Sequence, residues 1–91
     1  MVKFTEVIER RGAQFVESTK NNYQMREVYI NPEHIVMVRE DGYLSTLPAF
    51  SGKSFTKLVV NRGSSTYETT VVGTVSEIYE SINNRRSLLK G

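Results

Sequence analysis

The spacing of apolar residues changes once along the chain, at Gly73. Before this glycine, apolar side chains alternate with polar ones as in β-strands, and after it they recur with the 3.6-residue period of a helix. Thr74 and Glu77 form a capping box, because each side chain can bond a backbone N–H that the first helical turn leaves free. The apolar face of this helix comprises Val75, Ile78, Tyr79 and Ile82. The pattern predicts one amphipathic helix, at about 74–84.

The N-terminal part of the chain is typical of a hairpin. Residues 2–10 alternate loosely and predict a half-exposed strand, although 6–11 is also compatible with a helical turn. The turn signal at Gly12 is followed by residues 13–18, which would form the returning strand. Residues 20–24 are polar and rich in turn formers, so they predict a loop.

The following strands are more sharply defined. Residues 26–30 form a short strand that Pro32 terminates, because proline has no N–H to donate to a ladder. Residues 34–39 and 55–60 are apolar at both alternating positions, which is typical of strands covered on both faces. A short polar loop leads to 66–72, a β-branched strand that completes a second hairpin.

Together these elements predict a single α+β domain over 1–91: a strongly bent antiparallel sheet of five or six strands in hairpins, with one C-terminal helix packed on one face. Each large apolar side chain that the helix buries should contribute about 1.5–3 kcal/mol. Residues 87–91 are expected to fray. Because one helix of about three turns covers one face of the sheet, either the N-terminal hairpin or a second copy must cover the other, and we expect a homodimer.

Residues 41–54 interrupt the strands with turn formers but retain four apolar side chains, Tyr43, Leu44, Leu47 and Phe50. A loop of this length is uncommon in a small domain and is often functional. We expect these four residues to contact a partner protein or the other subunit of a dimer. The alternative is a flap that packs on the core of its own domain.

The composition narrows the class of protein. The chain has 91 residues, of which 38% are hydrophobic and 24% charged, as in ordinary globular domains. It contains no cysteine, so it has neither disulfides nor a thiolate zinc site, which fits a reducing cytoplasm. No apolar run approaches the ~20 residues that span a bilayer, and no signal-peptide core is present, so we expect no membrane insertion.

A nucleic-acid-binding regulator is the alternative function. Its contacts would come from basic residues, with stacking from the aromatic residues of loop 41–54. The candidate contacts are Lys53, Lys57, Arg62, Arg85 and Arg86. The net charge is only +2, which equally suits a solvated basic rim.

Signs of catalysis are weak. His34 is the only histidine, so it has no second histidine with which to share a metal and no cysteine nucleophile to activate. Gly52-Lys53-Ser54 is similar to the end of a phosphate-binding loop, but the required earlier glycine is Leu47 and a strand follows in place of a helix. A carboxylate pair such as Glu17 with Glu27 stays open, with nothing to place it in a pocket. We therefore predict no enzyme, no cofactor, no metal and no small-molecule substrate.

Three segments resemble the FlbD/SwrD family of small bacterial flagellar and swarming motility proteins, over roughly residues 28–82. They are the run Val28-Tyr29-Ile30-Asn31-Pro32-Glu33-His34-Ile35, the strand 66–72 and the helix start at 73–78. The resemblance implies a small cytosolic accessory protein built from a β-sheet and a helix, and it carries no catalytic site. The N-terminal hairpin and the 41–54 insertion depart from that pattern. The function predicted is a non-catalytic protein-binding or regulatory module of bacterial or phage type.

Overall fold

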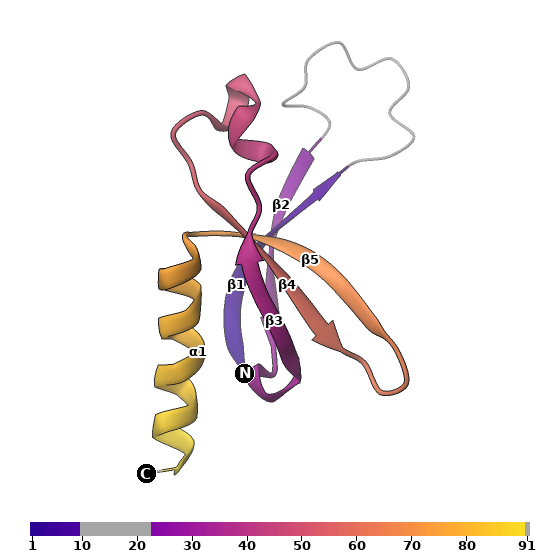
Figure 1. Cartoon of the computed structure of the whole chain (residues 1–91), viewed down its shortest axis with the longest axis vertical. Coiled ribbons are helices and arrows are strands. Elements are labelled where there is room, and N and C mark those ends of the chain that lie inside the picture. Colours follow the sequence, from indigo (N-terminus) through magenta and orange to yellow (C-terminus); the bar gives the residue numbers. More distant parts are fainter. Residues whose placement is uncertain (10–22, 91) are drawn as a thin grey trace.

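The computed structural model describes residues 1–9 and 23–90, with side chains as far as residue 84. In this part of the chain a five-stranded antiparallel sheet has the order β2-β1-β5-β4-β3, and helix α1 packs against it (Figure 1). The elements are β1 Val2–Glu9, β2 Tyr23–Ile30, β3 Ile35–Glu40, β4 Phe55–Asn61, β5 Thr66–Val72 and α1 Val75–Lys90. The α+β fold predicted from the sequence is confirmed.

The first hairpin pairs different segments from those predicted. β1 runs antiparallel to β2 along its whole length, from Val2 opposite Ile30 to Glu9 opposite Tyr23. The predicted loop is wrong at residues 23 and 24, which are already strand, because pairing with β1 overrides their weak local preference. The helical alternative is wrong for residues 6–9, which belong to β1. The expected strand at 13–18 lies outside the described residues.

The sheet is held together between its two hairpins by a short seam. β1 pairs with β5 only at Glu6 and Val7, although both strands continue beyond these residues. The same register would bring Ile8 opposite Thr69 and then Glu9 opposite Glu68, and like charges opposed across a ladder are destabilising. The β1–β2 and β4–β5 hairpins diverge from this point, which gives the sheet its strong bend (Figure 1).

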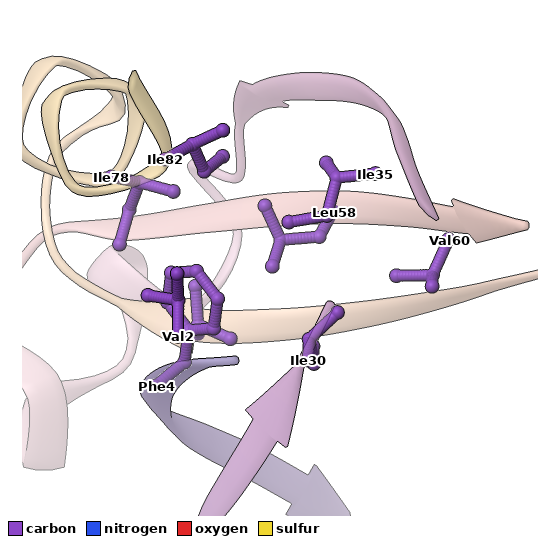
Figure 2. Close-up of a cluster of buried hydrophobic side chains, with 9 residues drawn as sticks. Val2, Phe4, Ile30, Ile35, Leu58, Val60, Ile78 and Ile82 are labelled. Carbon is purple, nitrogen blue, oxygen red and sulfur yellow. The ribbon is translucent and has the colours of Figure 1, made fainter. Parts of the chain in front are cut away.

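The main core lies between the sheet and α1, as Figure 2 shows. Its buried members are Val2, Phe4, Ile30, Ile35, Leu58, Val60, Val71, Ile78 and Ile82. Ile78 and Ile82 confirm the predicted helix face, and Val75 is half-buried. The prediction is wrong for Tyr79, which is 57% exposed. Its position at the margin of the helix face places it beyond the core, beside β3.

The prediction that residues 34–39 are covered on both faces is also wrong. β3 is the outermost strand of the described sheet, and Val36 and Met37 are 58% and 49% exposed. A β-bulge between Ile35 and Met37 shifts the register with β4 at this point. The interior strand β4, which lies between β5 and β3, fits the prediction better, because Phe55, Leu58 and Val60 are buried.

Loop 41–54 covers the end of the sheet that α1 leaves open. It folds into two 3-10 turns, Leu44–Thr46 and Pro48–Phe50. Leu44 and Phe50 are buried with Val7 and Phe55 in a second core cluster. The Phe50 ring makes edge-to-face contacts with Phe55 and Tyr23, at centroid distances of 5.4 and 5.6 Å. For Leu44 and Phe50, the structure matches the core-packing alternative.

Helix α1 begins as predicted and runs further. The Glu77 N–H donates to Thr74 Oγ1 at 3.1 Å, and the Thr74 N–H donates to Glu77 Oε1 at 2.9 Å, which is the expected capping box. The helix ends at Lys90 rather than near residue 84, since the Arg, Leu and Lys residues after Asn84 are good helix formers. The predicted tail, 87–91, thus overlaps its last turn. No helix in the described part of the chain has the length and apolarity that a membrane crossing requires.

Candidate functional site

An apolar groove lies between the outer edge of β3 and helix α1. Its volume is about 310 Å³. The lining residues are Ile35, Val36, Met37, Val38, Val75, Tyr79, Ile82 and Asn83. We call this surface the β3–α1 groove. It combines a strand edge with the exposed margin of the helix, so main-chain and apolar contacts are available together.

The backbone of β3 alternates in direction, and half of it points away from the sheet. The Asp41 N–H donates to the Phe55 carbonyl of β4 at 3.0 Å. Because bonded and non-bonded pairs alternate in an antiparallel ladder, Arg39 and Met37 also direct their N–H and C=O groups toward β4. Val38 and Glu40 therefore direct theirs outward, and no described strand lies beyond them.

The side chains along this edge are unusually apolar for an outermost strand. Val36 and Met37 are about half exposed, and Tyr79 of α1 lines the same groove. The Met37 side chain alternates with that of Val38 and so lies on the face of the strand opposite α1. Charge enters only at the end of the strand, where Arg39 Nη2 lies 3.6 Å from Glu68 Oε2. Outward N–H and C=O groups next to exposed apolar side chains form a template for strand addition.

Loop 41–54, where partner contacts were predicted, offers much less surface. Leu44 and Phe50 are 5% and 7% exposed, so both are committed to the core, and Leu47 is half-buried. Tyr43 is 65% exposed, and it hydrogen-bonds with Tyr23. Burial raises the pKa of the Tyr23 phenol above its ordinary value, and Tyr43 and Glu9 raise this pKa further. A partner contact in this loop stays a prediction for Tyr43.

The structure does not gather the basic residues named for nucleic acid. Lys53 and Arg62 lie beyond opposite ends of the seven-residue strand β4, which at a rise of about 3.3 Å per residue separates them by roughly 20 Å or more. Lys57 Nζ lies 3.5 Å from Glu68 Oε1. The Arg62 guanidinium stacks over the Tyr67 ring, 4.5 Å from its centroid. Arg85 and Arg86 lie in α1 beyond residue 84, the last residue whose side chain the structure describes.

A second, polar hollow of about 540 Å³ opens where β1 and β5 diverge. We call it the β1–β5 fork; its lining includes Glu6, Glu9 and Glu68. The Glu6 carboxylate accepts from Arg26 Nε at 3.1 Å and from the Thr69 hydroxyl, and Glu68 is paired with Arg39 and Lys57. These carboxylates are therefore engaged in structural interactions, and the hollow is open to solvent, which is unlike a catalytic acid–base pair.

Other chemistry has little support in the described residues. His34 is the last residue of the 3-10 turn Pro32–His34. Asn31 caps this turn, and its side chain accepts a hydrogen bond from the Glu33 N–H at 3.0 Å. No group of three or more His, Cys, Asp or Glu within residues 1–9 and 23–84 is placed to hold a metal ion. Gly52 adopts a positive φ of 82° and Ser54 leads directly into β4, so a helix N-terminus for a phosphate is absent at this point.

Sequence reasoning missed the β3–α1 groove because it placed β3 inside the sheet. The run Val36-Met37-Val38 gives no local sign of edge position, since the order of strands depends on which distant segment pairs with β1. One signal in the sequence could have indicated it: the predicted strands carry apolar residues on both faces, and a single helix covers only one of them. Comparisons with protein-family models, with curated proteins and with solved structures give no match for this chain.

Proposed function

We propose that this chain is a small non-catalytic protein-binding module and that the β3–α1 groove is its binding surface. The observation that carries the proposal is the apolar edge strand, with outward N–H and C=O groups at Val38 beside the exposed Tyr79 ring. Main-chain bonds to a strand edge give affinity, and the adjoining apolar surface gives selectivity for the side chains of the bound segment.

Two further observations favour protein over other ligands. The groove is lined mostly by apolar residues and by no basic residue, whereas a nucleic-acid surface would need clustered basic groups for phosphate contacts. The basic side chains that the sequence suggested are dispersed or paired, as Lys57 is with Glu68. The similarity to small motility proteins and the cysteine-free composition support, as part of this proposal, a cytoplasmic regulatory role in a bacterium or phage.

The chain contains a matched pair of surfaces for the test. Met37 and Tyr79 in the groove are 49% and 57% exposed, and Met25 and Tyr29 on β2 are 42% and 59% exposed. The double variants Met37→Lys/Tyr79→Ser and Met25→Lys/Tyr29→Ser therefore make the same chemical change at the β3–α1 groove and at the β2 edge. Each tagged protein is used to capture partners from an extract of the native host, after circular dichroism has established that it is folded.

The groove variant is expected to lose the captured proteins, and the β2 variant to retain them. Equal capture by both variants would contradict the assignment of the groove. If the proteins captured do not depend on either edge, and a salt-sensitive mobility shift with DNA or RNA is found instead, then the nucleic-acid function is the correct one.

A further inference from the structure

We infer that the occupant of the β3–α1 groove is a second copy of this chain, whose β3 pairs antiparallel with the first. The inference rests on the proposed function, because it names the partner of the same surface. The edge of β3 is complementary to itself, in its backbone and in its side chains. In a closed two-fold dimer, if residue i of one chain faces residue j of the partner, then residue j of the first chain must also face residue i of the partner.

Only one register satisfies the backbone and the charges together. With Arg39 or Glu40 on the two-fold axis, like charges would oppose each other, which destabilises a strand pair. With Met37 on the axis, every bonded pair would include Val36, which lies in the β-bulge. With Val38 on the axis, its outward N–H and C=O groups bond directly to those of the partner's Val38, so the central bonded pair lies outside the bulge and only the flanking pairs of Val36 with Glu40 reach it.

The side chains are complementary in this register. Val38 meets the partner's Val38 on the face that carries α1. On the opposite face, Met37 lies across from the partner's Arg39, and the aliphatic part of arginine packs well on apolar groups while its charge stays solvated. Arg39 keeps its own acidic neighbour, Glu68, at 3.6 Å. The symmetry repeats each contact twice, and no like charges are opposed.

The same symmetry accounts for the exposed margin of the helix. A two-fold axis perpendicular to the sheet keeps both copies of α1 on one face of a continuous sheet. The two grooves then open toward each other above the Val38 pair, so the Tyr79 ring gains an apolar surface that a single chain lacks. The dimer thus uses the exposed apolar side chains at the edge of β3, Val36 and Met37, together with Tyr79 of α1, and Met37 makes its contacts on the face opposite the helix.

The first test is sedimentation equilibrium of the purified protein, whose monomer mass is 10.4 kDa. The wild type is expected to show a concentration-dependent dimer. Met37→Lys places a lysine opposite the partner's Arg39 at two symmetry-related positions, and it should raise the dissociation constant about 100-fold. Met25→Lys, the matched change on β2, should leave the constant unchanged. A strict monomer at all concentrations, or a dimer insensitive to Met37→Lys, would overturn the inference.

The second test measures the register. The chain has no cysteine, so one introduced thiol reports on its own symmetry mate. In the bonded pair the two Cα atoms of residue 38 would lie about 5.5 Å apart, within disulfide range. The two Met37 positions are diagonal neighbours at roughly 7–8 Å, which is outside it. Val38→Cys should therefore form a cross-linked dimer under mild oxidation at least about tenfold faster than Met37→Cys. The opposite order would overturn the register.

The two proposals can fail separately. Sedimentation uses the purified chain alone, and capture uses a host extract. A protein that is strictly monomeric, yet loses its captured host proteins on Met37→Lys/Tyr79→Ser, would overturn the second copy and leave the binding function standing. A dimer that depends on Met37, with no host protein captured through the groove, would support self-association as the use of this surface.

Discussion

The two edge strands of the sheet, β2 and β3, differ in how they expose their backbone. β2 carries Arg26 and Glu27 in its middle, paired with Glu6 and Lys3 of β1 at 3.1 and 3.5 Å. β3 carries apolar residues up to Arg39 and has α1 beside it. Charged residues on an edge strand discourage pairing with another chain. One edge of this sheet is therefore protected, and the other is left able to pair with another strand.

Exposure of single apolar residues does not make this difference. Met25 on β2 is nearly as exposed as Met37 on β3. What differs is the neighbours along the strand, because Met25 stands between Gln24 and Arg26, whereas Met37 stands between two valines. A contiguous apolar stretch marks an interaction surface, and scattered apolar residues do not.

The comparison also predicts different sources of stability at the two edges, and Ile78→Asp should have the largest effect. Ile78 is 5% exposed in the core that α1 forms with the sheet. Burying a carboxylate there should cost more than about 4 kcal/mol and unfold the protein. Thermal denaturation followed by circular dichroism measures this loss of stability. Ser81→Asp, on the exposed side of α1, is the control and should change stability by about 0.5 kcal/mol or less. A melting temperature of Ile78→Asp within a few degrees of wild type would contradict the fold.

Gly73→Ala should weaken the β3 side selectively. Gly73 has a φ of 129°, and a Cβ there would lie 3.2 Å from Ile78 Cδ1, at the start of the helix that borders the groove. The expected cost is about 1–3 kcal/mol, seen in urea denaturation and as faster amide exchange in β3 and β4 than in β1 and β2. Gly42→Ala is the control, because no atom lies within 4 Å of its added Cβ. Equal losses in the two variants would argue against this geometry.

Arg26→Met should weaken the β2 side. It removes a donor from Glu6, whose side chain is only 13% exposed, and should cost about 1–2 kcal/mol. Lys3→Met removes the second ion pair between the same strands, but both of its partners are more than half exposed, so about 0.5 kcal/mol or less is expected. Chemical denaturation of the two variants side by side gives the difference. If the two variants lost the same free energy of unfolding, the partial burial of Glu6 would not strengthen its ion pair with Arg26.

The smallest effect is expected in alkali, at the first residue of β2. The pKa of Tyr23 is raised above its ordinary value of 10.0, so the folded state favours the protonated phenol. The stability this residue contributes is complete below about pH 10 and is lost as the pH rises through the raised pKa. Tyr23→Phe should flatten the fall in unfolding free energy above pH 10, measured by chemical denaturation over a pH series. A fall as steep as that of the wild type would contradict the burial of Tyr23.

Local signals in the sequence were sufficient to predict the helix and the strands, but they were insufficient to predict the order of the strands in the sheet. The Thr74–Glu77 capping box and the Asn31-Pro32 turn were predictable, since each depends on residues a few positions apart. The exposure of Val36, Met37 and Tyr79 was not, because it depends on β3 being outermost. In the same way, the partner of β1 is a strand that begins at Tyr23, where loop-forming residues masked the pattern.

The candidate site was missed for a related reason. Turn formers and aromatic residues drew attention to loop 41–54, yet Phe50 contacts Phe55 and Tyr23 within the domain. Aromatic residues in a loop signal burial as readily as recognition, and the distinction requires knowing what lies beneath them. The prediction of more apolar surface than one helix covers came nearer to the exposed edge of β3 than any motif did, although it placed that surface on the face of the sheet opposite the helix.

The short seam between β1 and β5 has a consequence for the order in which the molecule forms during synthesis. The Glu6 carboxylate accepts a hydrogen bond from Thr69, 63 residues later. At about 5–20 residues per second, a ribosome takes on the order of several seconds to deliver that partner. During this interval the inner edge of β1 has no β5 to pair with, and its carboxylates, Glu6 and Glu9, discourage a wrong neighbour. Glu9, whose opposition to Glu68 limits the ladder in the finished sheet, thus also helps to keep the nascent strand available for β5.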